Sequence, residues 1–248
     1  MKTIKKAILP GAEIIETALW LKKPDVLIIA DLHLGFEETQ TRQGVMLPRF
    51  NFEEIKKSLE KIFAKRERFE KIVIDGDLKH EFGIPSQQEW KEALGLLDLL
   101  QKHCKEILLV QGNHDNVLGP IAAWRGIRIL KEGFFLEKEK IFITHGHKFF
   151  FSREFEQAKT IIIGHDHVAV TIREGTKRET FKCFLKGKYE GKCLVVLPSM
   201  SPIATGTDVL KNKLLSPFLQ GDMLGFECWV VADKQLYFGK LKNIERLG

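Results

Sequence analysis

The hydrophobic positions in the first half of the chain form short apolar runs separated by longer stretches with helical spacing. Apolar runs of strand length occupy residues 26–30, 71–75 and 106–110. Between them, residues 51–66 and 86–103 place apolar side chains three or four positions apart, which is the spacing of a helix that buries one face. This order predicts β–α–β units, in which helices connect the strands of one sheet.

Local signals mark the ends of both predicted helices. Asn51 stands where an N-cap is expected for the first helix. The run from Ser86 to Glu89 matches a capping box at the start of the second. His103 falls at the end of the second helix, where the helix dipole stabilises a cation. We therefore expect His103 to be a helix-end residue rather than a ligand.

The pattern changes after residue 126, where short strands follow one another with turn-like or charged pairs between them. Short connections of this kind indicate antiparallel neighbours. An earlier β-rich run, Glu13–Leu21, is expected to be one strand. The strands expected in the second half are Ile127–Leu130, Gly133–Leu136, Lys140–Thr144, Thr160–Ile163, Val168–Ile172, Thr180–Leu185, Cys193–Leu197, Phe226–Val231 and Leu236–Leu241.

We therefore predict an α/β fold with two packed mixed sheets and helices outside them, a four-layer α/β/β/α sandwich. Residues 1–248 are expected to form one domain, because no Ser-, Gly- or Pro-rich linker and no internal repeat interrupts the sequence. Two connections, residues 34–50 and 198–217, are either lids over a site or surface loops, and the sequence leaves both open. Charged side chains in the first, such as Glu37, are expected to face solvent.

Composition narrows the class of protein. The four cysteines form no C-x-x-C pair, which favours buried thiols in a reducing compartment over disulfides or zinc. No run of about 18 uncharged apolar residues occurs, and the first 16 residues lack the apolar core of a signal peptide, so we expect a cytoplasmic protein without a membrane partner. The net charge of +6 favours anionic partners such as phosphates or nucleic acid, although a lysine-rich surface explains it equally well.

Five polar clusters directly follow five of the predicted strands. Because sites in open α/β sheets form outside the carboxyl ends of the strands, these clusters are expected to form one site. They contain carboxylates, imidazoles and an amide, which are metal-ligating and acid–base groups. The clusters are Asp31-Leu32-His33, Gly76-Asp77-Leu78-Lys79-His80, Gly112-Asn113-His114-Asp115, His145-Gly146-His147 and Gly164-His165-Asp166-His167.

In sequence order these clusters read D-x-H, G-D-x-x-H, G-N-H-D, H-G-H and G-H-x-H. The series resembles the calcineurin-like metallophosphoesterases over residues 25–167, and is most similar to the ICC-type branch, whose bacterial members are sometimes called ligase-associated phosphoesterases. The resemblance is specific because five separately spaced motifs coincide. It implies the α/β/β/α sandwich, the hydrolysis of phosphate esters and two divalent metal ions, with Mn²⁺ favoured.

The family pattern also implies which side chains hold the two ions. Asp77 is expected to bridge them, since a carboxylate can offer one oxygen to each ion of a pair about 3.5–4 Å apart. A nitrogen and oxygen ligand set without thiolate suits Mn²⁺, Fe, Ni²⁺, Co²⁺ or Zn²⁺. The pattern assigns Asp31, His33 and His167 to the first ion, and Asn113, His145 and His165 to the second.

Other residues of the clusters are candidates for acting on the substrate. His114 follows a ligand directly, so we expect it to protonate the leaving group after a metal-bridging hydroxide attacks phosphorus in line, with Asp115 orienting its ring. His80 occupies a position where phosphodiesterases and nucleases of the family often carry histidine, and is either a second donor to the substrate or a structural histidine. Lys79 is expected to face solvent, and His147 to contact a ligand rather than a metal.

These residues favour a phosphodiesterase that acts on nucleotides or small diesters. A DNA or RNA nuclease in a repair setting is the alternative, although no long basic tract with interleaved aromatics supports sequence-specific binding. A scaffold on the same fold, like the retromer subunit, is disfavoured because such proteins typically lose the catalytic histidine, and this chain keeps His114. The sequence does not indicate the natural substrate, the native metal or the oligomeric state.

Overall fold

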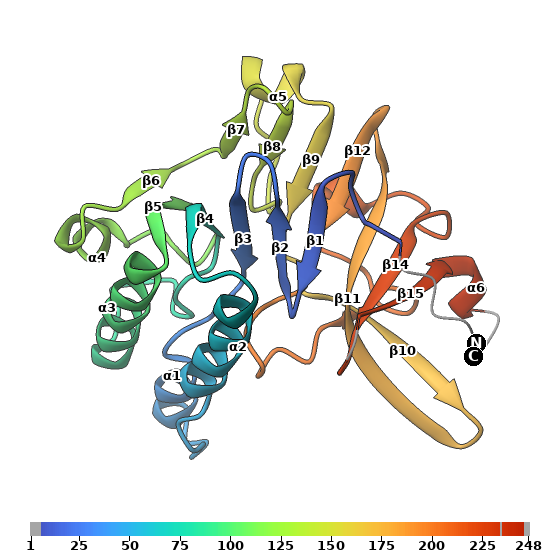
Figure 1. Ribbon diagram of the computed structural model, residues 1–248. Helices are drawn as coiled ribbons and strands as arrows, with labels where there is room; N and C mark the ends of the chain where they lie inside the picture. Colours follow the sequence, from blue (N-terminus) through green and yellow to red (C-terminus); the bar gives the residue numbers. More distant parts are fainter. Residues whose placement is uncertain (1–5, 234, 246–248) are drawn as a thin grey trace.

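Two β-sheets packed face to face form the centre of the protein (Figure 1). The structure is a computed structural model that describes residues 6–233 and 235–245. In the first sheet the strands lie in sequence order, from β1 to β6. They are β1 (Ala12–Ile15), β2 (Ala18–Leu21), β3 (Val26–Ala30), β4 (Phe69–Asp75), β5 (Cys104–Val110) and β6 (Arg128–Leu130).

The strands β3 to β6 are parallel, whereas β1, β2 and β3 pair antiparallel. Helices make the parallel connections, as the hydrophobic spacing predicts. The connection from β3 to β4 holds α1 (Phe36–Arg42) and α2 (Asn51–Lys65), the next holds α3 (Gln87–Lys102), and α4 (Gly119–Trp124) precedes β6. Parallel strands bring their carboxyl ends to one edge of the sheet, which is where the first three polar clusters lie.

The second sheet has the order β13-β10-β11-β12-β9-β8-β7, and β14 and β15 extend it from β11. Within it β8, β9 and β12 are parallel neighbours, so the clusters after β8 and β9 also share an edge. Its strands are β7 (Phe134–Leu136), β8 (Ile141–Ile143), β9 (Thr160–Ile163), β10 (Val168–Glu174), β11 (Lys177–Tyr189), β12 (Lys192–Val196), β13 (Thr207–Asp208), β14 (Glu227–Val231) and β15 (Gln235–Lys240).

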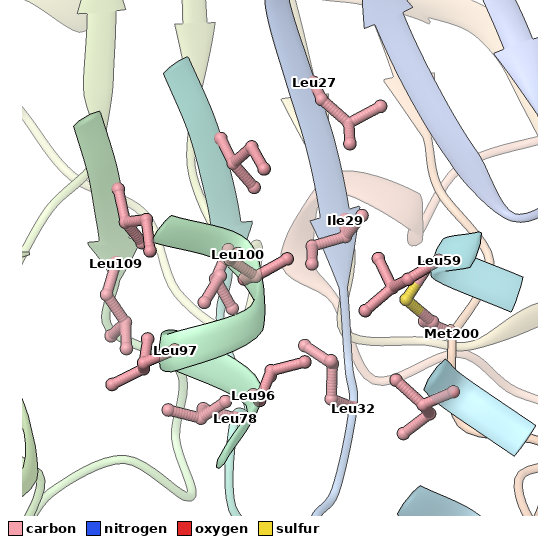
Figure 2. Packing of buried hydrophobic residues seen from close by; sticks show 14 of the residues in the cluster. Leu27, Ile29, Leu32, Leu59, Leu78, Leu96, Leu97, Leu100, Leu109 and Met200 are labelled. Atoms are coloured by element: carbon pink, nitrogen blue, oxygen red, sulfur yellow. The ribbon is translucent and has the colours of Figure 1, made fainter. Parts of the chain in front are cut away.

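Alternate residues of each central strand face two different cores. Leu27 and Ile29 of β3 pack with the apolar faces of α2 and α3, as Figure 2 shows. Val26, Ile28 and Ala30 face the second sheet and join the core between the two sheets. This period of two follows from the pleat of a strand, and it explains why strands buried on both faces read as continuous apolar runs.

The outer face of the second sheet is covered by short elements. They are α5 (Arg153–Gln157), α6 (Leu241–Glu245) and the 3₁₀ turn η1 (Pro217–Leu219). Phe155, Leu241 and Phe218 from these elements pack with the outward side chains of β9 to β12 and β14. The predicted arrangement of two mixed sheets with helices outside is thus confirmed, and its fourth layer consists of single helical turns and irregular chain.

Several local predictions are wrong. The run Glu13–Leu21 is a hairpin of β1 and β2 rather than one strand. Residues 34–50 contain α1, and Glu37 in that helix is buried. Asn51 is the first residue of α2 and not its N-cap, because the carboxylate of Glu37 accepts the N–H groups of Phe50 and Asn51, at 3.0 and 2.8 Å. The capping box of α3 is confirmed, with Ser86 as N-cap.

Within the described part of the chain, no helix combines the length and apolar character that crossing a membrane requires. The four cysteines are free thiols, and three of them are buried, which agrees with the prediction that they form no disulfides. His103 ends α3 and stacks on Phe63 with ring centroids 3.8 Å apart.

Candidate metal centre

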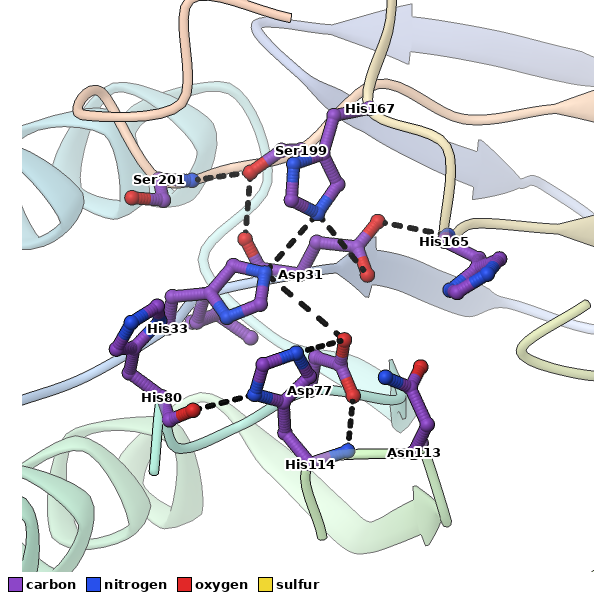
Figure 3. Close-up of polar contacts among 12 residues, drawn as sticks. Asp31, His33, Asp77, His80, Asn113, His114, His165, His167, Ser199 and Ser201 are labelled. Atoms are coloured by element: carbon purple, nitrogen blue, oxygen red, sulfur yellow. Dashed lines mark hydrogen bonds and ion pairs between the residues drawn. The ribbon is translucent and has the colours of Figure 1, made fainter. Parts of the chain in front are cut away.

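The predicted ligands come from both sheets and lie close together after the ends of their strands (Figure 3). Asp31 and His33 follow β3, Asp77 follows β4, and Asn113 follows β5. From the second sheet, His145 follows β8, and His165 and His167 follow β9. The five clusters that the sequence places at strand ends therefore do form one site.

Asp31, His33 and His167 make the first group, whose ligand atoms all lie within 4.8 Å of one another. The Nε2 atoms of His33 and His167 are 2.9 Å apart. Nε2 of His167 lies 3.8 Å from Oδ1 of Asp31. These are the three side chains that the sequence assigns to one ion.

Asp77, His145 and His165 make the second group, with the same spread of ligand atoms. Nε2 of His145 lies 3.4 Å from Oδ2 of Asp77 and 3.1 Å from Oδ1 of Asn113. Asn113 therefore adjoins this group, as expected for the second ion.

Asp77 lies between the two groups. Its Oδ2 is 3.4 Å from Nε2 of His145 on one side and 3.9 Å from Nε2 of His33 on the other. Its Oδ1 accepts the backbone N–H of His114 at 3.0 Å. One carboxylate is thus within reach of both groups while a backbone hydrogen bond fixes its orientation.

The backbone at the ligand positions is strained. Asp31, His33, Asp77, His165 and His167 all have positive φ, between 46° and 73°. The left-handed region is unfavourable for residues with a side chain, and each such residue costs about 1–3 kcal/mol unless the surroundings hold it in place. Five of the seven predicted ligands share this conformation, so the fold stabilises an arrangement that the isolated loops would not adopt.

Two glycines of the motifs are needed for close approach. A Cβ added at Gly112 would lie 2.1 Å from Oδ1 of Asp77. A Cβ added at Gly76, whose φ is 78°, would lie 2.1 Å from Nδ1 of His145. Any side chain at either position would displace a predicted ligand, which is the physical reason for glycine in both motifs.

Burial and charge set the protonation of the central pair. Burial opposes ionisation of His145, but the carboxylates of Asp77 and Asp31 outweigh it and raise the pKa of His145 to about 10. Burial alone would also raise the pKa of Asp77, yet the facing His145, His33 and His114 hold that pKa below its usual range. Without a cation the two side chains therefore form a buried ion pair.

The imidazoles of His165 and His167 are neutral. Burial lowers the pKa of His165 to about 4 and that of His167 to about 3. A neutral imidazole is the form that binds a metal ion. Both side chains are therefore in their ligand form over the physiological pH range.

The chemistry of these residues fits a pair of divalent cations. Oδ1 of Asp31 and Nδ1 of His165 are buried without a hydrogen-bond partner among the described residues. Buried polar atoms without a partner are unfavourable, and a cation between the converging side chains removes that penalty. Imidazole nitrogens together with carboxylate and amide oxygens suit transition metals such as Mn²⁺, Fe or Zn²⁺.

A family model of the calcineurin-like phosphoesterases matches residues 24–178, which is more than half of the chain. The chain belongs to the calcineurin-like phosphoesterases. The family predicted from the five motifs is therefore confirmed. No curated protein matched this phosphoesterase in sequence.

A solved structure shares the fold of this chain, and a second matches it at a lower TM-score. The nuclease MPE of Pseudomonas putida is 16% identical, with a TM-score of 0.62 over 91% of this chain and 93% of its own. Vps29 of Entamoeba histolytica complexed with Zn²⁺ is 17% identical and covers 86% of this chain and 99% of its own, at a TM-score of 0.36. At 16% identity the similarity to the nuclease MPE describes the fold alone.

His114 of the phosphoesterase lies beside the bridging position of Asp77. Its Nε2 is 3.8 Å from Oδ2 of Asp77. Its Nδ1 donates to the backbone carbonyl of His80.

Asp115 was expected to orient the ring of His114, but among the described residues no hydrogen bond joins the two side chains. The carboxylate of Asp115 accepts the backbone N–H of Leu78 and of Gly112, at 3.1 and 3.0 Å, and so ties two ligand loops together.

His80 stands at the edge of the first group. Its ring centroid is 5.4 Å from that of His33 and 5.5 Å from that of His114, and these three histidines form a further cluster of ligand atoms within 4.8 Å. Nδ1 of His80 is buried without a hydrogen-bond partner in the described chain. His147 lies outside these groups, with its ring centroid 5.3 Å from that of His145.

Lys79 is buried, which contradicts the prediction that it faces solvent. Its exposed fraction is 0%, and its ammonium group donates to the backbone carbonyl of Glu81. Burial lowers its pKa, and the nearby carboxylates of Glu89 and Asp115 oppose that shift. The backbone of Lys79 pairs with the buried Leu34 in a parallel bridge, so Lys79 lies in a packed stretch of chain and not in an exposed loop.

The sequence reasoning missed several residues around the site. Asp75 is fully buried with both carboxylate oxygens unpaired among the described residues. Glu89 does more than close a capping box, because Oε1 also accepts the N–H groups of His80 and Glu81 at 3.0 and 2.7 Å. Phe82 stacks on the ring of His114, with centroids 3.8 Å apart. A carboxylate at the end of an apolar run was the available signal for Asp75, while the other two contacts have no local signal.

Proposed function

We propose that this chain is a metal-dependent phosphodiesterase with two divalent ions, which hydrolyses phosphate esters. The observation that carries the proposal is the position of Asp77 within reach of both ligand groups. The first ion would be held by Asp31, His33, His167 and Asp77, and the second by Asp77, Asn113, His145 and His165.

Bound metal ions lower the pKa of coordinated water and offset negative charge on a phosphoryl group. The protein contributes the ligand geometry and the protonation states. Neutral His165 and His167 present free electron pairs, because burial keeps their pKa values low. The carboxylate of Asp77 stays ionised because its pKa is held below its usual range. We propose Mn²⁺ as the native ion, since the family resemblance favours it.

His114 would protonate the leaving group. Its Nδ1 donates to the carbonyl of His80, so Nδ1 carries one proton and Nε2 is the atom that faces the ligand groups. An imidazolium at this position delivers its proton from Nε2. General acids of this kind contribute about 10²- to 10⁴-fold to the rate.

His80 favours a diester over a monoester. A diester carries less negative charge and a second ester arm, and it calls for a neutral or protonatable donor rather than additional fixed positive charge. Burial lowers the pKa of His80, so its imidazole is neutral at neutral pH. Its Nδ1 is buried without a partner among residues 6–233 and 235–245, so the ring has hydrogen-bonding capacity that these residues do not use.

The test is a substrate panel with the Mn²⁺-loaded protein: an aryl phosphomonoester, the matched diester, cyclic nucleotides and single-stranded DNA. We expect kcat/KM for the diester to exceed that for the monoester. A preference for the monoester would reject the diesterase assignment. Absence of turnover on every member of the panel, with two ions bound, would instead support a scaffold role.

A nuclease is the second candidate, and Phe82 is the observation that favours it. Its side chain is 55% exposed and stacks on His114 beside the ligand groups, and an exposed aromatic ring next to a phosphate site can stack on a base. The Pseudomonas putida structure of the same fold is named a nuclease. Polynucleotide binding that weakens steeply with salt, through counterion release, would favour this function over the hydrolysis of small diesters.

A further inference from the structure

Three serines in the segment of residues 198–217 are buried, so at these positions the segment is neither a lid nor a surface loop. Ser199, Ser201 and Ser216 are 0%, 1% and 0% exposed. Each hydroxyl donates to a group in another part of the chain. These serines lie beyond residue 178, where the match to the family model ends.

The first contact holds the turn that carries Asp31 and His33. Oγ of Ser199 donates to the backbone carbonyl of Asp31 at 2.6 Å, and the N–H of Ser201 donates to the same carbonyl at 3.2 Å. Figure 3 shows Ser199 next to Asp31 on the side away from Asp77. Lys182 in turn donates its ammonium group to the carbonyls of Ser199 and Ser201, which fixes the serine segment itself.

Asn51 completes this contact from α2. Its Nδ2 donates to the backbone carbonyls of Leu32 and His33, at 3.2 and 3.0 Å. Its Oδ1 accepts the hydroxyl of Ser201 at 2.8 Å. The carbonyls of three consecutive residues, 31 to 33, therefore all accept hydrogen bonds from distant parts of the chain.

The second contact holds the other ligand loops. Oγ of Ser216 donates to the backbone carbonyl of Gly146, which follows His145, at 2.7 Å. The N–H groups of Leu215 and Ser216 donate to the carboxylate of Asp166 at 2.6 and 2.9 Å. Asp166 lies between His165 of the second group and His167 of the first, so these backbone contacts serve both groups. The hydroxyl contacts are specific to one group each, since Ser199 donates to Asp31 and Ser216 donates to Gly146 beside His145.

We propose that residues 198–217 position the two metal sites separately, with Ser199 fixing the first site through Asp31 and Ser216 fixing the second through Gly146 and His145. The inference rests on the proposed dinuclear function. Its physical basis is the strain at Asp31 and His33, which persists only where surrounding contacts over-determine the backbone. Groups that orient metal ligands from behind typically change metal affinity by about 10- to 100-fold.

Single-site proteins allow each serine to be tested against one ion. In a His165→Ala background only the first site remains complete, and in a His33→Ala background only the second. Calorimetric titration of metal-free protein with Mn²⁺ gives the Kd of the remaining site. We expect Ser199→Ala to weaken the first site by about 10- to 100-fold and to leave the second unchanged, and Ser216→Ala to do the reverse.

Ser152→Ala is the matched control. Its hydroxyl caps α5, accepting the N–H of Phe155 at 3.2 Å, so its loss destabilises the fold without touching a ligand loop. It should leave Mn²⁺ affinity unchanged in both backgrounds. If the His165→Ala or His33→Ala protein binds Mn²⁺ too weakly to titrate, the serine substitutions are made in the wild-type chain instead. The Mn²⁺ content of each variant is then measured after gel filtration, and each should retain one ion.

Equal losses at both sites, or no loss at either, would overturn the positioning role. Wild-type protein that binds no pair of ions would refute the proposed function itself. Wild-type protein that binds two ions, together with serine variants of unchanged affinity, would refute only the present inference.

Discussion

The ring of His114 is held by the backbone of His80, through a hydrogen bond from Nδ1 to the carbonyl oxygen. The His80 backbone is fixed in turn, since its N–H lies 3.0 Å from Oε1 of Glu89 and 3.0 Å from the carbonyl of Leu34. The two histidines are therefore connected by a main-chain group. A substitution at position 80 removes the imidazole but keeps the carbonyl that orients His114.

His114→Ala should leave the content of bound metal near that of wild type and lower kcat by about 10²- to 10⁴-fold. The reason is that His114 contacts the ligand groups without belonging to either predicted ligand set. Metal content and rate are measured on one preparation. His103→Ala, at the far end of α3, is the control and should keep the wild-type rate. An unchanged rate with a poor leaving group would remove His114 from the mechanism.

His80→Asn should lower diesterase activity much more than monoesterase activity and retain both ions. The carbonyl that holds His114 stays in place, so general acid catalysis should persist. Values of kcat/KM for a matched aryl monoester and diester in both proteins decide the matter. Equal losses on the two substrates would show that His80 is a structural residue and leave the ester class unassigned.

Asp77→Ala should prevent stable binding of both ions and abolish turnover, because its carboxylate adjoins both ligand groups. Metal analysis of the purified variant is the measurement. Asp98→Ala is the matched control, since Asp98 pairs with Arg125 on the surface and should retain two ions. Full occupancy by two ions in the Asp77 variant would rule out the bridging role.

Asp75→Asn should stabilise the metal-free protein increasingly as pH rises. Burial raises the pKa of Asp75 from 3.8 to about 7. Between these values the unfolded chain releases a proton that the folded protein keeps, so ionisation favours unfolding by up to about 1.4 kcal/mol per pH unit. The stabilisation of the variant relative to wild type should therefore grow from about pH 4 to pH 7 and be constant above it.

Urea denaturation at a series of pH values measures this difference for Asp75→Asn. Asp98→Asn should change stability in the opposite direction and lower it at neutral pH. The reason is that hydrogen bonds from Arg125 hold the pKa of Asp98 below its usual value. That pair contributes stability above the unfolded pKa and loses it only as pH falls. If the difference in stability between Asp75→Asn and wild type did not change with pH, the pKa of the Asp75 carboxyl group would not be raised in the folded protein.

The ligand positions could be predicted because regular strands deliver them. Apolar runs such as residues 26–30 fix where a buried strand ends, and the next polar residue is then at the sheet edge. Parallel order brings Asp31, Asp77 and Asn113 together, and the family motifs supply the partners from the second sheet. The same regularity accounts for the correct prediction of two packed sheets.

The failures arise where contacts distant in sequence override a local signal. Asn51 looks like a helix cap, but Glu37 satisfies the free N–H groups and the Asn51 side chain bonds to residues 32 and 33 instead. Lys79 looks like a surface lysine, but its side chain is buried and its backbone pairs with Leu34. Neither partner can be identified from spacing along the chain.

The division of the predicted ligands between the sheets makes the metal centre sensitive to shear. Four of them follow strands of the first sheet, and His145, His165 and His167 follow strands of the second. Any sliding of one sheet over the other changes the distances within the ligand set. Phe184 and Val195 lie in the core between the sheets, so a change in their volume alters the alignment of the two halves and reaches the ions without contacting a ligand.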